Sequence, residues 1–219
     1  MLYIVSTPIG NLKDITYRAV ETLKNVDLIA AEDTRHTKKL CQHYDIETPL
    51  TSYFEHNEMK KAEMLLKELR AGKNVALVSD AGTPGISDPG YKLINLAMKE
   101  HIPLSVIPGP TAAIAALSLS GLPTDRFLFD GFLPVKPNAR RKKLEELKQY
   151  SGTIIFYESP HRLIKTLEDI AVVLDNPTVV VTREITKTFE EVKKAPARDL
   201  LAAFSSKPPK GEFVSLLHL

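Results

Sequence analysis

Short apolar runs alternate with amphipathic stretches along this sequence, and that alternation is what most restricts its fold. Val75–Val78 is a continuous apolar run, typical of a strand buried on both faces. Glu58–Ala71 carries apolar residues at helical spacing and is followed by Gly72, a common stop signal. In the first half, strands are expected at 2–5, 28–31, 75–78 and 104–107, and helices at 16–24, 37–44, 58–71, 91–100 and 111–119. Such alternation predicts a parallel sheet covered by helices on both faces.

The second half repeats the α/β pattern with more strands adjacent in sequence. Strands are expected at 127–132, 153–157, 178–182, 189–193 and 213–217, and helices at 140–149, 162–174 and 198–204. A turn-rich boundary near Ser120–Thr124 divides the chain into domains 1–120 and 121–219. The prediction is a two-domain α/β protein, with a parallel sheet in the N-terminal domain and a mixed sheet in the C-terminal one.

Composition and missing motifs exclude several classes of protein. The chain has 219 residues and a net charge of +2, which argues against a histone-like protein and an acidic disordered tail. Cys41 is the single cysteine, so a cytoplasmic protein without an internal disulfide is expected. No apolar run approaches the roughly 18 residues of a membrane span, and the N-terminus lacks a secretory pattern. The dinucleotide fingerprint, the P-loop and the hydrolase elbow are absent, and the histidines show no metal-ligand spacing, so no metal is expected.

Loops that carry proline and glycine follow several of the expected strands. In an open α/β sheet, ligands bind outside the carboxyl ends of the strands, where glycine allows close backbone approach and proline stiffens the rim. These loops therefore predict a pocket for a ligand such as a nucleoside, although each loop alone could be an ordinary turn. The loops are Thr7–Gly10, Asp80–Gly85, Asp88–Gly90, Pro108–Thr111 and Glu158–Arg162.

Two polar clusters also follow expected strands. The segment Glu32–Thr37 is able to supply a general base, a phosphate-binding arginine or a hydroxyl contact. The alternative is that Asp33 or Thr34 caps the following helix. The segment Arg183–Thr188 points to the same edge, although Arg183 and Glu184 are equally consistent with a surface pair.

A basic run, Lys136–Lys143, stands out in a chain of nearly balanced charge. Residues 133–149 hold six Lys or Arg and two Glu. The run is either a solvated helix face or a contact for nucleic-acid phosphates. Phe127 and Phe129 nearby are expected on a shared core face, with base stacking as the less favoured interpretation.

Six motifs in order resemble one known family, the 16S rRNA (cytidine-2′-O)-methyltransferases. This is the ribosomal small subunit methyltransferase I family of the tetrapyrrole methylase superfamily. The resemblance covers residues 1 to about 215 and rests on these segments: Thr7–Asp14, Ala31–Thr37, Val78–Gly90, Pro108–Ala112, Phe156–Arg162 and Arg183–Glu191.

The resemblance implies a two-domain fold that holds S-adenosylmethionine (SAM) between the domains, commonly as a homodimer. It implies 2′-O-methylation of a cytidine ribose in the decoding region of 16S rRNA, on the small ribosomal subunit. The residues implied in SAM binding are Ile9, Asp80, Ala81, Gly82, Thr83, Ile86, Thr111, Ala112, Phe156, Tyr157 and Glu158.

Methyl transfer to a ribose hydroxyl needs close positioning and profits from a base. The proton-accepting candidates are Glu32, Asp33, His36, Glu158 and Lys187, with the Glu32–His36 cluster preferred. The residues expected to position RNA phosphates are Arg35, Arg140, Arg141, Lys142, Lys143 and Arg162.

Two other functions remain open at this stage. One is a small-molecule tetrapyrrole methylase of precorrin type, against which the basic run and the Glu32–Thr37 cluster argue. The other is a non-catalytic rRNA-binding assembly protein, against which the intact Asp80–Pro84 and Pro108–Ala112 loops argue. Family relatives extend past the last expected strand into a short helical segment, which either is dispensable or strengthens RNA binding.

Overall fold

The computed structural model describes all residues, 1–219, as two compact units, Met1–Thr111 and Ala112–Leu219. The boundary lies before helix α5 (Ala112–Ser120) rather than after it, which corrects the predicted division at residue 120. The reason is packing, because α5 buries Ala113, Ala116 and Leu117 and contacts strands of the second unit.

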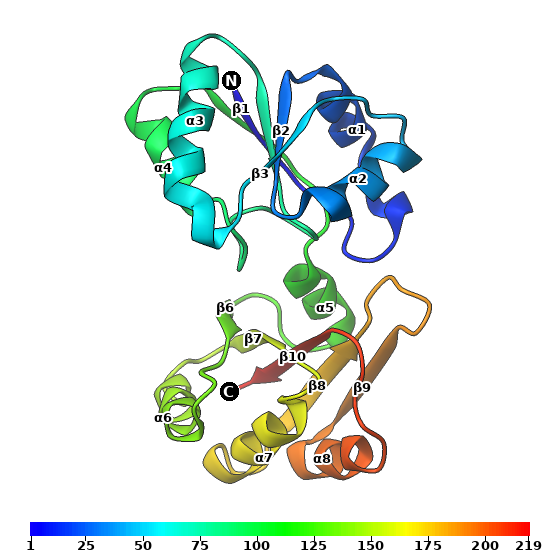
Figure 1. Ribbon diagram of the computed structural model, residues 1–219. Helices are drawn as coiled ribbons and strands as arrows, with labels where there is room; N and C mark the ends of the chain where they lie inside the picture. Colours follow the sequence, from blue (N-terminus) through cyan, green and yellow to red (C-terminus); the bar gives the residue numbers. More distant parts are fainter. The chain divides into compact units, whose positions relative to one another are not determined.

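The first unit is built on a five-stranded sheet in which every neighbouring pair is parallel (Figure 1). The strand order is β3-β2-β4-β1-β5. Its strands are β1 (Leu2–Val5), β2 (Leu28–Ala31), β3 (Leu50–Ser52), β4 (Val75–Val78) and β5 (Leu104–Ile107). This confirms the predicted parallel sheet and adds β3, a three-residue edge strand that the sequence pattern did not reveal.

Helices cover both faces of this sheet because the strand side chains alternate between two cores. Leu2, Val75 and Leu77 pack with α3 and α4, whereas Ala76 and Val78 pack with α1 and α2. Figure 1 shows the two helix pairs on opposite sides of the sheet. The helices are α1 (Tyr17–Asn25), α2 (Thr34–His43), α3 (Glu58–Arg70) and α4 (Tyr91–Lys99), with short 3-10 turns η1 (Leu12–Asp14) and η2 (Glu55–Asn57).

The second unit contains a mixed sheet, as predicted, in the order β6-β7-β10-β8-β9. The β6–β7 pair is parallel and the remaining pairs are antiparallel. Its strands are β6 (Phe127–Phe132), β7 (Thr153–Glu158), β8 (Thr178–Arg183), β9 (Glu191–Pro196) and β10 (Phe213–His218).

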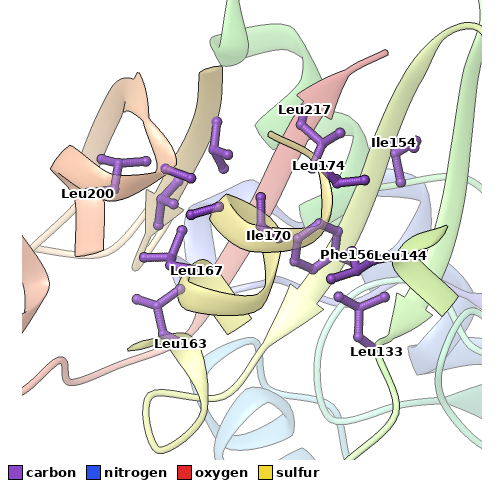
Figure 2. Close-up of a cluster of buried hydrophobic side chains, with 14 of the residues drawn as sticks. Leu133, Leu144, Ile154, Phe156, Leu163, Leu167, Ile170, Leu174, Leu200 and Leu217 are labelled. Carbon is purple, nitrogen blue, oxygen red and sulfur yellow. The ribbon is translucent and has the colours of Figure 1, made fainter. Parts of the chain in front are cut away.

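Three helices bury one face of the mixed sheet, and Figure 2 shows the resulting core. Phe156 of β7 packs among Leu144 of α6 and Leu167 and Ile170 of α7. These helices are α6 (Pro137–Leu147), α7 (Leu163–Val173) and α8 (Ala197–Ser205). No helix in either unit combines the length and apolar character needed to cross a membrane.

Candidate functional site

The loops after β1, β4 and β5 are bound together at the carboxyl edge of the parallel sheet. Thr7 and Gly82 exchange two backbone hydrogen bonds, with N–O distances of 2.9 and 3.0 Å. The hydroxyl oxygens of Ser6 and Thr83 lie 2.8 Å apart, and the Thr83 hydroxyl donates to Pro110 O at 3.5 Å. Three of the predicted loops therefore meet, which the sequence anticipated from their positions after strands.

Two glycines make this meeting possible. A Cβ at Gly109 would lie 2.8 Å from Ser6 Cβ, closer than a side chain tolerates. Gly82 has φ +81°, a left-handed conformation that favours glycine, and its Cβ position faces Ile9 Cγ2 at 3.5 Å. Ile9, in the loop after β1, is buried.

Asp80 links the β4 loop to the loop after β2. Its Oδ1 accepts the Asp33 N–H at 3.0 Å, and its own N–H donates to Glu32 Oε2 at 3.2 Å. No protein donor reaches the second oxygen of Asp80. The structure thus brings Glu32 and Asp33 against the expected cofactor loop, with one carboxylate oxygen left for a ligand.

The preferred base cluster separates into groups with different chemistry. Asp33 caps α2 by accepting the Arg35 N–H, and hydrogen bonds from Arg35 lower the pKa of Asp33 to about 2. Burial raises the pKa of Glu32, and the charges of Asp80 and Asp33 raise it further against the opposing Asp80 N–H. His36 is exposed on the first turn of α2. Among Glu32, Asp33 and His36, Glu32 is therefore the residue whose raised pKa best suits it to accept a proton.

A cavity of about 430 Å³ opens beside Glu32. The residues that line it are Glu32, Glu55, Glu58, Ser87, Asp88, Pro89, Tyr91 and Lys92. Burial raises the pKa of Asp88 to about 6, and the negative charge of Glu32 contributes in the same direction. The Asp88–Gly90 loop is among those that the sequence predicts at the pocket, but only the folded chain shows Asp88 and Glu32 lining one cavity.

Glu58, a buried residue that also lines the cavity, is a site residue that the sequence pattern did not indicate. Glu58 lies on α3, accepts the Gly90 N–H at 3.2 Å and pairs with Lys92 Nζ at 2.9 Å. Burial, followed by the charge of Glu58, raises the pKa of Tyr53 to about 12. The sequence gives one indication of Glu58 as a site residue, namely an acidic side chain at a buried position of a helix.

Lys187, in the second unit, is held by two carboxylates. Its Nζ lies 3.1 Å from Glu184 Oε1 and 2.9 Å from Glu212 Oε2. Although burial opposes the charge, these hydrogen bonds raise the pKa of Lys187. The side chain stays protonated and is unsuited to act as a base.

The β7 segment Phe156–Glu158 presents few free side-chain groups. Phe156 is fully buried in the helix-side core, so only its backbone is able to contact a cofactor. Glu158 accepts the Ser159 N–H and the Thr166 hydroxyl, and it lies 3.3 Å from Arg162 Nε. Tyr157 packs edge-on against Phe129. Glu158 and Arg162 therefore stabilise the loop after β7, and Arg162 also donates to Leu133 O.

The basic run divides into structural and exposed cations. Arg140 is 3% exposed and donates to Asp169 Oδ2 at 2.7 Å, which corrects its interpretation as a surface phosphate contact. Arg141 shares Asp169 but is half exposed, and Lys143 pairs with Asp130. Lys142 is exposed and unpaired. Burial of the helix face of α6 explains why Arg140 turns inward.

The remaining sequence-derived residues are exposed or partly buried. Ala81 is exposed beside Gly82, Ile86 is 45% exposed, and Thr111 and Ala112 follow the Pro108–Pro110 turn. Arg35 is exposed and paired with Asp33. No three side chains of His, Cys, Asp or Glu gather in an arrangement suited to a metal ion.

Comparison with known proteins gives consistent matches along the chain. Residues 1–201 match the family model of tetrapyrrole (corrin/porphyrin) methylases. A protein named ribosomal RNA small subunit methyltransferase I from Halalkalibacterium halodurans is 52% identical over 97% of this chain and 73% of its own length. Its namesake from Escherichia coli O157:H7 is 55% identical over 92% of this chain and 71% of its own length.

Solved structures share the fold at low identity. Diphthine synthase superposes with a TM-score of 0.73 at 15% identity, covering 99% of this chain and 88% of that one. A uroporphyrin-III C-methyltransferase from Thermus thermophilus, complexed with S-adenosyl homocysteine, gives 0.67 at 18% identity and covers 98% and 96%. These likenesses bear on the fold.

Proposed function

The chain belongs to the tetrapyrrole methylase family and, within it, to the ribosomal RNA small subunit methyltransferase I proteins, and from that premise we propose that it transfers a methyl group from SAM to a ribose 2′-hydroxyl of a cytidine in 16S rRNA. The observation that carries the proposal is the backbone-lined edge where the loops after β1, β4 and β5 meet beside Asp80. The relatives named for rRNA, at about half identity, favour this substrate over a porphyrinoid.

The residues at this edge fit a nucleoside-bearing cofactor. A carboxylate that is anchored through one oxygen and open at the other suits the hydroxyl pair of a ribose. Gly82 and Gly109 let these loops pack closely against Ile9 and Ser6, which fixes the shape of the edge. When bound, SAM supplies an electrophilic methyl group on a positively charged sulfur.

The chain's own contribution is position and proton transfer. Rigid loops would hold the reacting atoms in line, and orientation of this kind supplies a large share of a rate enhancement. Glu32 accepts the Asp80 N–H, and it lines the cavity together with a second carboxylate, Asp88. The ribose hydroxyl is a weak nucleophile at neutral pH, so a nearby carboxylate that accepts its proton would raise the rate about 10²–10⁴-fold.

The decisive experiment supplies labelled SAM and small ribosomal subunits from a strain that lacks the methyltransferase. Mass spectrometry of the digested rRNA is expected to show 2′-O-methylcytidine, and primer extension to show one stop in the decoding region. A methyl group on a base, or none at all, would contradict the proposal.

Two further measurements address the alternatives. Uroporphyrinogen III offered as acceptor should take up no label if the rRNA assignment is right. Calorimetric titration with SAM separates enzyme from assembly protein, because an RNA-binding protein without a cofactor site gives no heat. Sedimentation of the full chain would test the predicted homodimer.

A further inference from the structure

The cavity of about 430 Å³ in the first unit is lined by the carboxylates of Glu32, Glu55, Glu58 and Asp88, and is called the acidic cavity below. These carboxylates differ in the contacts that hold them. Glu32 is tied through Oε2 to the Asp80 N–H, and Glu58 is tied to the Gly90 N–H and to Lys92. Asp88 also lines the cavity and is only partly buried, and the nearby Ser79 hydroxyl donates to Ala81 O at 3.4 Å. Unlike Glu58, Asp88 is thus a lining carboxylate outside any ion pair of the cavity.

The loop that carries Asp88 is fixed in place. Gly90 has φ +150°, and a Cβ there would lie 3.1 Å from Gly85 N and 3.2 Å from Leu77 Cδ2. Ser79, whose side chain lowers the pKa of Asp88 against the effect of burial, stands directly before Asp80 in the expected cofactor loop. The position of Asp88 is therefore set by the same loop that would hold the methyl donor.

We propose that the Asp88 carboxylate removes the proton from the ribose 2′-hydroxyl during methyl transfer, inside the cavity that it lines with Glu32. This inference rests on the proposed function and names a residue for its proton transfer. The hydroxyl oxygen bonds to the methyl carbon as the carbon–sulfur bond breaks, and that electron pair stays on sulfur as a neutral thioether. The hydroxyl proton passes to Asp88 and then to water.

The other ionisable groups near Asp88 define its behaviour. Two carboxylates close together resist simultaneous ionisation, so each favours a proton on the other. The groups that face the cavity or act on Asp88 are Glu32, Asp80, Glu55, Glu58, Tyr91 and Lys92. Burial and the charges of Glu32 and Asp80 together place the pKa of Asp88 at about 6, near the operating range of an efficient general base.

The test is single-turnover methylation of small ribosomal subunits by the full chain between pH 5 and 9. Asp88→Asn is expected to lower the rate at least about 100-fold and to remove the rise in rate near pH 6. Glu32→Gln is expected to shift the midpoint of that rise to lower pH, because the repelling charge is gone. Glu63→Gln removes one exposed charge on α3, outside the cavity, and should leave the profile unchanged.

Calorimetric SAM binding and thermal unfolding accompany each variant. Unchanged SAM affinity with a lost rate supports the assignment, whereas a wild-type rate and pH profile in Asp88→Asn would overturn it. Loss of SAM affinity in that variant would also overturn it, since Asp88 would then act in binding. If Asp88→Asn does not fold, the pH–rate profile of Glu32→Gln decides. A midpoint at lower pH supports the proposal, and an unchanged midpoint overturns it. Absence of methylation by the wild-type chain refutes the proposed function itself and is visible before any variant is compared.

Discussion

Neighbouring groups, rather than residue type, decide what each carboxylate at the sheet edge is able to do. Asp33 is held by Arg35 with a pKa of about 2, whereas burial and Glu32 raise the pKa of Asp88 to about 6. Asp80 is anchored by a single backbone N–H. The sequence offered these residues as similar acids beside turns, and only the fold distinguishes a cap, a proton acceptor and a ligand contact.

Replacement of Asp80 by Ala is expected to weaken SAM binding about 10- to 100-fold. The change removes a carboxylate contact to the cofactor and leaves the Asp33 N–H without its acceptor. Calorimetry measures the affinity directly. Asp80→Asn is the matched control, because its amide oxygen still accepts the Asp33 N–H, and an unchanged affinity in Asp80→Ala would remove this residue from the site.

The pH dependence of stability should reveal Asp88 independently of catalysis. Its pKa is raised from 3.8 to about 6, so the stability that the protonated group contributes is complete below pH 3.8 and lost as the pH rises through 6. Asp88→Asn should not show this loss. Urea unfolding measures the free energy of unfolding of the variant minus that of wild type. This difference is expected to be about 1–2 kcal/mol larger at pH 7 than at pH 4, after solvent screening. A difference that does not vary with pH would contradict the raised pKa.

Some side-chain contacts between helices, such as buried ion pairs, are not predicted by the spacing of residues in the sequence. Arg140 of α6 reaches Asp169 of α7 across 29 positions, and both side chains are buried. The basic pattern around Arg140 predicted a surface residue, because a run of cations gives no sign that one of them has a buried partner. Periodicity predicted the two helices, and it had no means of predicting the ion pair that joins them.

Arg140→Ala is expected to destabilise the protein by about 3–5 kcal/mol, since it leaves the buried Asp169 charge without its main partner. Arg141, half exposed, also contacts Asp169 and limits the loss. Denaturant unfolding provides the measurement, with Lys142→Ala as the control on the exposed face of α6. A change below about 0.5 kcal/mol for Arg140→Ala would show that the pair is not structural.

Across the whole chain, the sequence predicted the two sheet types and most elements, because buried parallel strands and amphipathic helices have distinct apolar periods. The edge strand β3 escaped prediction, being three residues long and bound on one side only. The domain boundary was misplaced for a related reason. Helix α5 is apolar, and its sequence does not say which unit it packs against. Asp88 and Glu58 entered the site only through contacts between distant positions.

With a net charge of only +2, the chain is able to bind RNA if a few unpaired cations lie together and contact its phosphates. In the basic run, Arg140, Arg141 and Lys143 are paired with acids, whereas Lys136 and Lys142 are exposed without partners.

The double variant Lys136→Gln/Lys142→Gln is therefore expected to weaken binding of 16S rRNA. The salt dependence of log K should flatten by about 1.4 for two contacts to single-stranded phosphates. Titrations over a range of KCl concentrations measure this slope, and SAM affinity should stay unchanged. Lys148→Gln, whose lysine is paired with Glu145, serves as the control. An identical slope in the double variant would place the RNA contact elsewhere, because a phosphate contact cannot be lost without returning its counterion to the strand.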